Sequence, residues 1–305
     1  MRKNNGVKVE DDEDEAIEDE AIKKTIKAGQ ILKQVREEAV KLIKPEVKIL
    51  EVAEFVENRI RELGAEPAFP CNLSINSDAA HFTPKKNDNR GFKEGDVVKL
   101  DIGSHIDGYI ADTAITIDLG DNEDLVKAAE AALKAGIEVV HAGVDTAEIG
   151  RAIESAIKEF GYKPVVNLTG HGLLPYLTHT PPTIYNFGAD KGVRLEEGII
   201  IAIEPFATNG IGRVVERSEC EIYSVVSKRP VRMKMARQIL KEVEKYKTLP
   251  FAKRWLSKAP EVIIGRLVRD GILRSYPVLT EMGGGLVSQA EHTIIVEEDG
   301  ARIVT

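Results

Sequence analysis

Apolar residues in the first part of the chain recur at steps of mostly three and four positions, which is the pattern of an amphipathic helix. The residues that follow this spacing are Ile22, Ile26, Leu32, Val35, Ala39 and Ile43. The pattern predicts a helix that ends near Pro45 and a second helix that runs to Gly64, because proline and glycine commonly mark helix ends.

The same order of elements returns about one hundred residues later. An Ala-rich segment predicts a third helix over 122–141, and a fourth helix begins at Asp145 and Glu148, which have the spacing of a capping box, and ends at Gly161. The similarity between the halves exceeds what helix periodicity alone would produce. A shift of 97 residues superposes Glu51 on Glu148, Glu57 on Glu154, Ile60 on Ile157, Gly64 on Gly161 and Pro67 on Pro164.

The duplication includes a strand in each half. With the shift grown to 103, FKEGDVVKLD at 92–101 aligns with LEEGIIIAIE at 195–204, so that Asp101 falls on Glu204. Two acidic residues therefore end two equivalent strands. A repeated helix-helix-strand unit of this kind predicts a pseudo-twofold α+β core with a site on the axis between the halves.

Two segments have no counterpart in the repeat. Eight of the ten residues from Asp11 to Glu20 are acidic, so we expect residues 1–18 to form a mobile, disordered tail. An interaction arm for a basic partner such as a ribosome surface is the alternative. Residues 214–283 are basic and helix-prone, which predicts a helical insertion within a catalytic domain of residues 19–213 and 284–305. Packed helices with ordinary surface lysines are favoured here over an RNA-binding face.

Composition narrows the class of protein. A chain of 305 residues with 43% hydrophobic content can bury a full core. No apolar stretch approaches the roughly 18 to 20 residues of a membrane span, and no signal-peptide pattern begins the chain, so we expect a cytoplasmic protein. With only Cys71 and Cys220 present, a reducing compartment is favoured, although one bridge between them stays open. The net charge of −8 argues against broad or specific binding to DNA, and a monomer is expected.

A predicted hairpin carries two acidic residues. Asp101 ends one strand and Asp112 lies in the next, with an Asp107-Gly108 turn signal between them. If the hairpin is symmetric, the two carboxylates face each other across the strands, and this like-charge pair requires neutralisation. A bound cation is the simplest remedy. A shared proton and two aspartates that point to water are the alternatives.

Three further residues lie beside apolar strand sequence. They are His171 in NLTGHG, Glu204 in IIIAIEPF and Glu291 in SQAEHTIIV. A buried carboxylate is costly unless it is paired or bound to a metal, yet each residue alone is compatible with a hydrogen-bonded core position. Four carboxylates and one imidazole together suit a pair of divalent ions bridged by carboxylates.

These five residues, in their order, resemble the metal-ligand signature of the type II methionine aminopeptidases, which have the pita-bread fold. The matching contexts are KLDIGSHIDGYIADTA, TGHG, AIEPFAT and QAEHT. FPCNLSINSDAAHFTP and the inserted TLPFAKRWL extend the similarity, which covers nearly everything from about Ile22 onward. The resemblance implies that Asp101 chelates one metal ion, that Asp112 and Glu291 bridge two, and that the other ion is completed by His171 and Glu204.

The resemblance also implies the reaction. A dinuclear centre of cobalt, manganese, iron or zinc would hydrolytically remove the initiator methionine of nascent proteins, with a small second residue preferred. Glu204 would pass on the proton of the attacking water, and His81 and His179 would contact the substrate. The implied pocket for the methionine side chain consists of Phe69, His81, Thr178, His179 and Tyr276.

Two departures and two competing functions accompany this resemblance. The segment HTPPTIYNF from His179 and the residue Ala290 differ from common family sequences, so we expect an altered substrate rim. Prolidases and aminopeptidase P share the fold and a similar ligand set, but they usually carry an additional N-terminal domain. A non-catalytic binding protein of the same fold is disfavoured because all five ligands are intact.

Overall fold

Two pairs of helices frame the core of the protein. The computed structural model describes residues 7–305, with side chains from Glu20 onward. Each predicted helix is present; the bounds of the last three are shifted by a few residues, and the first begins at Val7 rather than near Ile22. Asp145 caps the fourth helix, since its side chain accepts a hydrogen bond from the backbone N–H of Ala147 at 2.8 Å. The four helices are α1 (Val7–Val40), α2 (Ile49–Glu62), α3 (Glu123–Glu138) and α4 (Thr146–Glu159).

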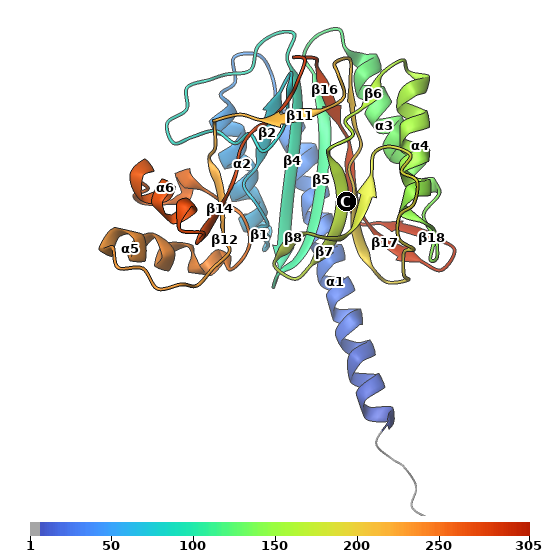
Figure 1. Ribbon diagram of the computed structural model, residues 1–305, viewed down its shortest axis with the longest axis horizontal. Coiled ribbons are helices and arrows are strands. Elements are labelled where there is room, and N and C mark those ends of the chain that lie inside the picture. The colour runs from blue at the N-terminus through green and yellow to red at the C-terminus, as the bar shows by residue number, and fades with distance from the viewer. Residues whose placement is uncertain (1–6) are drawn as a thin grey trace, which may run out of the picture.

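The first part of α1 extends away from the rest of the molecule (Figure 1). The sequence predicts a tail over residues 1–18, whereas the structure continues the helix back to Val7. Helix propagation fixes only one residue for each added hydrogen bond, so a helix packed from Ile22 onward can extend into such a segment at little cost. Residues 1–6 lie outside the described part of the chain, and the mobility of the tail stays a prediction.

One antiparallel sheet runs through both halves of the core. Its strands are β1 (Glu66–Pro67), β2 (Asn72–Ile75), β4 (Val97–Ile106), β5 (Tyr109–Asp118), β7 (Thr169–Leu174), β8 (Leu177–Tyr185), β9 (Ile200–Ile203), β17 (Glu291–Glu297) and β18 (Gly300–Ile303). The order is β1-β4-β5-β17-β9-β7-β8, with β2 beside β4 and β18 beside β17. The last long strand, β17, therefore joins the two halves, because it pairs with β5 on one side and β9 on the other.

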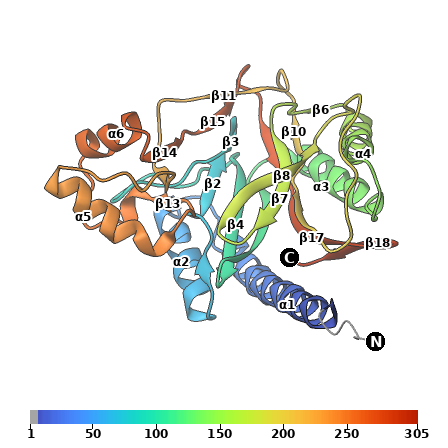
Figure 2. The same ribbon diagram turned by 60° about the horizontal axis from the view of Figure 1, so that its bottom comes forward.

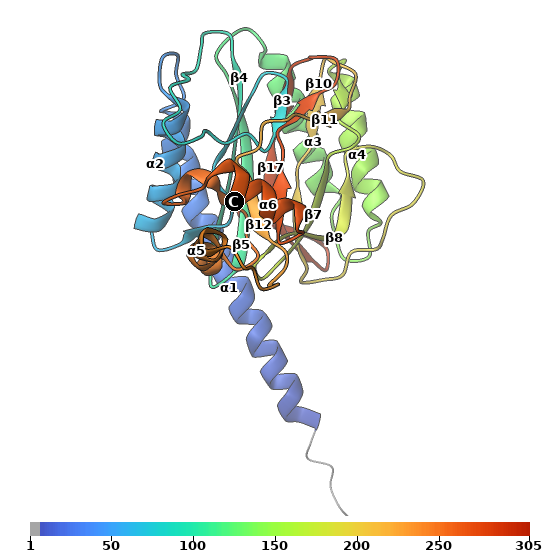
Figure 3. The same ribbon diagram turned by 60° about the vertical axis from the view of Figure 1, so that its left-hand side comes forward.

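Each half has its own hydrophobic cluster between helices and sheet. Leu32, Val56 and Leu100 belong to the cluster of α1, α2 and the β4–β5 hairpin. Ile153 and Ile203 belong to the cluster of α3, α4 and the second half of the sheet. Figure 3 shows α1 and α2 on one side of the strands and α3 and α4 on the other. This arrangement confirms the predicted α+β, pita-bread core with two related halves.

The internal repeat is visible in the backbone. Gly64 and Gly161 follow α2 and α4 with φ of 90° and 80°. Gly95 and Gly198, which align at the shift of 103, have φ of 88° and 79°. Glycine adopts these left-handed conformations without the steric cost of a β-carbon. The repeat found in the sequence is therefore also present in the backbone, where equivalent glycines of the two halves have the same left-handed conformation.

The β4–β5 hairpin differs in register from the prediction. Asp107 and Gly108 form its two-residue turn, with φ of 53° and 95°. Pairing is symmetric about the middle of this turn, so Asp112 lies opposite Gly103, and Asp101 lies opposite Ala114. The prediction that the two carboxylates face each other directly is wrong. They are offset by two positions and still lie on the same face, because side chains alternate along a strand.

Residues 214–283, here called the inserted lobe, form a body at one side of the core (Figures 1 and 2). The lobe has its own hydrophobic cluster, which includes Ile239, Phe251 and Leu267. It is only partly helical, since a three-stranded sheet lies beside its helices. Its elements are β11 (Val214–Glu216), β12 (Ile222–Val225), α5 (Lys234–Val243), η1 (Glu244–Tyr246), β13 (Phe251–Ala252), η2 (Lys253–Trp255), α6 (Glu261–Arg269), β14 (Leu273–Tyr276) and β15 (Leu279–Glu281).

The inserted lobe is joined to the first half by β strands. Both β11 and β3 pair with β15, so the lobe begins and ends beside the loop that follows β2. A second small sheet joins β16, β10 and β6 in the other half. These remaining strands are β3 (Asp78–Ala80), β6 (Lys163–Pro164), β10 (Phe206–Thr208) and β16 (Val287–Gln289). The division into domains by sequence stays a prediction.

Two features bear on the expectations from composition. Cys71 and Cys220 are both free thiols, so the bridge left open by the sequence is not formed. Within residues 7–305, no helix combines the length and the apolar character needed to cross a bilayer.

Candidate metal centre

The five predicted ligands converge on one cavity of about 220 Å³ between the two halves. Their strands are consecutive in the sheet order β4-β5-β17-β9-β7. Ala114 pairs with Asp101 on one side and with Glu291 on the other, so its short side chain separates two carboxylates in one row. Glu204 follows the last residue of β9, and His171 pairs with Ala202 of that strand.

The ligand atoms are close together and short of hydrogen-bond donors. One ligand atom each of Asp112, His171 and Glu291 lies within 4.8 Å of the others. Nε2 of His171 lies 3.4 Å from Oε1 of Glu204. The Oδ1 atoms of Asp101 and Asp112 are buried without a hydrogen-bond partner. Buried carboxylate oxygens normally have partners, so these orphaned atoms fit a cation between them.

Burial and mutual repulsion oppose ionisation of the four acids. Burial raises the pKa of Asp101 to about 7. Burial, followed by the negative charges of the neighbouring acids, raises the pKa of Asp112, Glu204 and Glu291 well above their ordinary values. Four ionised carboxylates are therefore unfavourable in this cavity on their own, and a positive charge among them would restore their ionised form.

The histidine supplies the form of imidazole that metals bind. Burial lowers the pKa of His171 to about 4, so the ring is neutral near pH 7. Its Nδ1 lies 3.3 Å from the carbonyl oxygen of Gly172, which leaves Nε2 directed to the acids. Four carboxylates and one neutral imidazole form a donor set suited to divalent ions such as manganese, iron, cobalt or zinc.

The predicted substrate-contacting residues line the same cavity. Phe69, His81, Thr178, His179 and Tyr276 are all in its wall. His81 has φ of 65°, and its ring meets that of Tyr276 edge to face, with centroids 5.8 Å apart. The His179 ring lies 4.3 Å from that of His171, and its Nδ1 lies 3.0 Å from Oγ1 of Thr178. The structure therefore brings all ten predicted site residues together.

Several residues of the site were missed by sequence reasoning. Gln289 approaches Asp101, with 3.5 Å between its Nε2 and Oδ2 of the aspartate, and Asn72 pairs with Asp101 in the sheet. Gln289 is the first residue of the QAEHT motif, so the sequence contained a signal for it. Ile222 and Pro250 also line the cavity, but they come from the inserted lobe. Local sequence offers no indication that these two apolar residues reach the site.

The two departures from common family sequences adjoin site residues, since the altered segment begins at His179 and Ala290 precedes Glu291. Ala290 packs in the hydrophobic cluster of the second half, behind the sheet. Pro181 and Pro182 line a separate cavity of about 370 Å³ together with Gly172 and Leu174. Pro181, Pro182 and Ala290 are not among the residues that line the metal cavity, and the altered substrate rim stays a prediction.

Comparisons with known proteins identify the family of this chain. A model of metallopeptidase family M24 matches residues 23–297. The chain is 71% identical over 290 residues to a methionine aminopeptidase of Archaeoglobus fulgidus, with 95% of this chain and 100% of the relative covered.

Solved structures share the fold at lower identity. A methionine aminopeptidase of Thermotoga maritima superposes with a TM-score of 0.70 at 24% identity, covering 94% of this chain and 96% of that one. A thermophilic Arx1 superposes with a TM-score of 0.82 at 19% identity, covering 93% and 90%. At such identity the likeness concerns the fold alone, whereas the sequence matches define the relationship: this chain belongs to metallopeptidase family M24.

Proposed function

We propose that this protein is a metal-dependent aminopeptidase that removes the initiator methionine from nascent polypeptides. The observation that carries the proposal is one cavity in which four carboxylates, those of Asp112 and Glu291 buried, and a neutral imidazole adjoin an aromatic wall and two further histidines. The methionine aminopeptidase of Archaeoglobus fulgidus, at 71% identity over its whole length, supports the same activity.

The five acidic and imidazole side chains would hold two divalent ions. Asp101 would bind one ion, Asp112 and Glu291 would serve both, and the second would be completed by His171 and Glu204. Cobalt, manganese, iron and zinc are all compatible with these donors. When bound, such ions polarise the scissile carbonyl and make hydroxide available near neutral pH.

The side chains of the protein perform the remaining steps. Glu204 takes the proton of the attacking water and delivers it to the departing amine. His179 and His81 donate hydrogen bonds to the carbonyl oxygen as its negative charge develops, and they orient the peptide. The rings of Phe69 and Tyr276 bound the space for the methionine side chain and exclude water from it.

The activity test compares two substrates on the same preparation. Metal-stripped protein is titrated separately with Mn, Fe, Co and Zn, and release of the first residue is measured for Met-Ala-Ser and for a Xaa-Pro dipeptide. We expect Met-Ala-Ser to be cleaved, with Met-Lys-Ser a poor substrate because a small second residue is preferred. Cleavage of the Xaa-Pro dipeptide alone would instead assign a prolidase activity.

We further propose that the enzyme is a cytoplasmic monomer of the type II class, with the inserted lobe as its distinguishing segment. The acidic residues 11–20 offer a basic ribosome surface a complementary charge. Sedimentation of the full chain with ribosomes, at low and at high salt, tests this association. If the protein does not sediment with ribosomes at low salt, the proposed ribosome association is wrong.

A further inference from the structure

We propose that the buried ion pair between Glu57 and Arg254 is a positioning device that holds the two walls of the substrate pocket at a fixed separation. One wall is the pocket-wall loop, defined here as residues 68–84 of the core, and the other is the inserted lobe. The proposal rests on the proposed function, and it names a determinant of selectivity that lies outside the cavity.

Glu57 lies on α2 and binds both walls at once. Its carboxylate accepts a hydrogen bond from the backbone N–H of Cys71 at 3.1 Å, within the pocket-wall loop. It also accepts one from Nε1 of Trp255 at 2.7 Å and pairs with Nη2 of Arg254, both in the inserted lobe. The side chains of Glu57 and Arg254 are each only 4% exposed.

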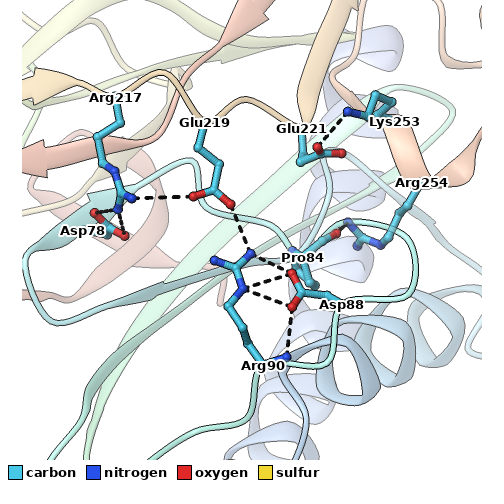
Figure 4. A network of polar contacts seen from close by, with 9 residues as sticks. All are labelled: Asp78, Pro84, Asp88, Arg90, Arg217, Glu219, Glu221, Lys253 and Arg254. Carbon is cyan, nitrogen blue, oxygen red and sulfur yellow. Dashed lines mark hydrogen bonds and ion pairs between the residues drawn. The ribbon is translucent and has the colours of Figure 1, made fainter. Parts of the chain in front are cut away.

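Arg254 binds the far end of the same loop. Its Nη1 donates to Oγ1 of Thr83 at 2.7 Å and to the carbonyl oxygen of Pro84 at 3.1 Å. Figure 4 shows the contact with Pro84 beside the ion pairs of the junction. Oγ1 of Thr83 in turn donates to the carbonyl oxygen of Cys71 at 2.7 Å. The pair therefore fastens the pocket-wall loop at Cys71, near its start, and at Thr83 and Pro84, at its end.

The pocket-wall loop and the inserted lobe both supply residues to the wall of the pocket. Phe69 and His81 come from the loop, whereas Ile222 and Tyr276 come from the lobe. The two walls meet where the His81 ring packs edge to face on Tyr276, and Nδ1 of His81 lies 3.3 Å from the carbonyl oxygen of Pro277. A change in the position of Arg254 relative to Glu57 would therefore shift these rings relative to one another.

Exposed ion pairs continue the same junction (Figure 4). Arg217 binds Asp78 at 2.8 and 2.9 Å, and Glu219 binds Arg90 at 3.1 Å. Both arginines are nearly half exposed, and exposed pairs contribute little to stability. Removing one partner of the buried pair has a larger effect, because it leaves an uncompensated charge out of water. Among the ion pairs of the junction, the pair of Glu57 and Arg254 therefore has the largest expected effect on the position of the lobe, in addition to the pairing of β3 with β15.

The internal repeat supplies a matched control. Glu154 is the equivalent of Glu57 in the second half, and it also binds a backbone N–H, that of Gly188 at 2.7 Å. Its other partner is Lys158 of its own helix, and its side chain is 26% exposed. Glu154 thus occupies the same place in the repeated unit but does not contact the inserted lobe.

The decisive comparison is Glu57→Gln with Glu154→Gln. For Glu57→Gln we expect unchanged metal content, a loss of about 10- to 100-fold in kcat/KM for Met-Ala-Ser, and a smaller preference for Met over Leu as the first residue. Faster amide hydrogen exchange over residues 69–84 should accompany these changes. Glu154→Gln should leave the kinetics, the selectivity and the exchange of this loop as in the parent protein.

Milder substitutions address the risk that Glu57→Gln does not fold. Trp255→Phe removes one hydrogen bond to Glu57 and keeps an aromatic ring, so it should give a smaller loss of selectivity in the same direction. Arg254→Lys keeps the charge and should retain more selectivity than Arg254→Met. Lower thermal stability with unchanged kinetics, selectivity and loop exchange in all these variants would overturn the proposal. If the parent protein releases no methionine, the proposed function fails, whereas loop exchange still tests the positioning role.

Discussion

The ring of Phe69 lies so close to Gly103 that a β-carbon at residue 103 would overlap its Cε1, Cδ1 and Cζ atoms. Gly103 is also the residue directly opposite Asp112 in the β4–β5 hairpin. A single backbone position therefore adjoins the aromatic wall of the pocket on one side and a candidate metal ligand on the other. The lack of a side chain at residue 103 is what lets the aromatic wall approach the sheet.

This contact predicts that Gly103→Ala alters the pocket and leaves the metal ligands in place. The added methyl group must displace Phe69, so we expect a fall of about 10- to 100-fold in kcat/KM for Met-Ala-Ser, with metal content unchanged. Gly265→Ala in α6 is the control, because its β-carbon would meet nothing nearer than 3.6 Å. Equal kinetics for the two variants would show that Phe69 does not bound the substrate.

Loss of a bridging carboxylate should remove metal and turnover together. We expect Asp112→Ala and Glu291→Ala to lower the metal content measured by elemental analysis and to reduce activity to background, because each residue is proposed to serve both ions. Asp190→Ala, at an exposed aspartate, should change neither quantity. Full metal content with normal activity in either site variant would contradict the two-ion assignment.

The three histidines of the cavity should separate into two kinds. His171→Ala should lose metal affinity and activity together, with part of the rate restored by excess metal. His81→Ala and His179→Ala should keep their metal but lose kcat by roughly 10² to 10⁴, the range for a positioned donor, without rescue by metal. Metal content, melting temperature and kinetics on the same preparations distinguish these cases. Loss of metal from His81→Ala would show that the division into ligands and substrate contacts is wrong.

Glu281 predicts a pH dependence of stability away from the metal centre. Its buried carboxylate accepts hydrogen bonds from the backbone N–H groups of Ile211, Gly212, Gly283 and Gly285 at 2.5 to 3.0 Å. Burial alone would raise its pKa, but these four donors together hold the pKa of Glu281 below its ordinary value of 4.5. The carboxylate therefore stabilises the fold above pH 4.5, and this stabilisation is lost as the pH falls through the lowered value.

The test compares Glu281→Gln with the parent protein in denaturant at pH 3 to 7. At pH 7 we expect the variant to be less stable by about 2 kcal/mol, the order of magnitude for lost hydrogen bonds to a charged group. The difference should shrink as the pH falls below 4.5. Glu298→Gln, at an exposed glutamate, should show no such difference. A difference that stays constant across the range would contradict this assignment.

Local sequence was enough to predict the helices and the repeat, whereas the ligand set follows from the resemblance to a known family and stays a prediction. Helix formation and helix ends depend on interactions between residues three to five positions apart. The sequence displays these directly, in the apolar period of α1 and in the glycines that follow α2 and α4. The equivalence of Asp101 and Glu204 follows from the duplication. Polar residues within apolar strands, such as Glu291, are conspicuous because burial without a partner is costly.

Only the tertiary structure decided which distant residues meet. The register of the β4–β5 hairpin follows its Asp107-Gly108 turn. Direct pairing of Asp101 with Asp112 would need a hairpin centred one residue earlier, so Asp112 lies opposite Gly103 instead. The contact of Glu57 with Arg254 joins residues 197 positions apart. No periodic pattern encodes such a pair, because it depends on how the inserted lobe packs against the finished core.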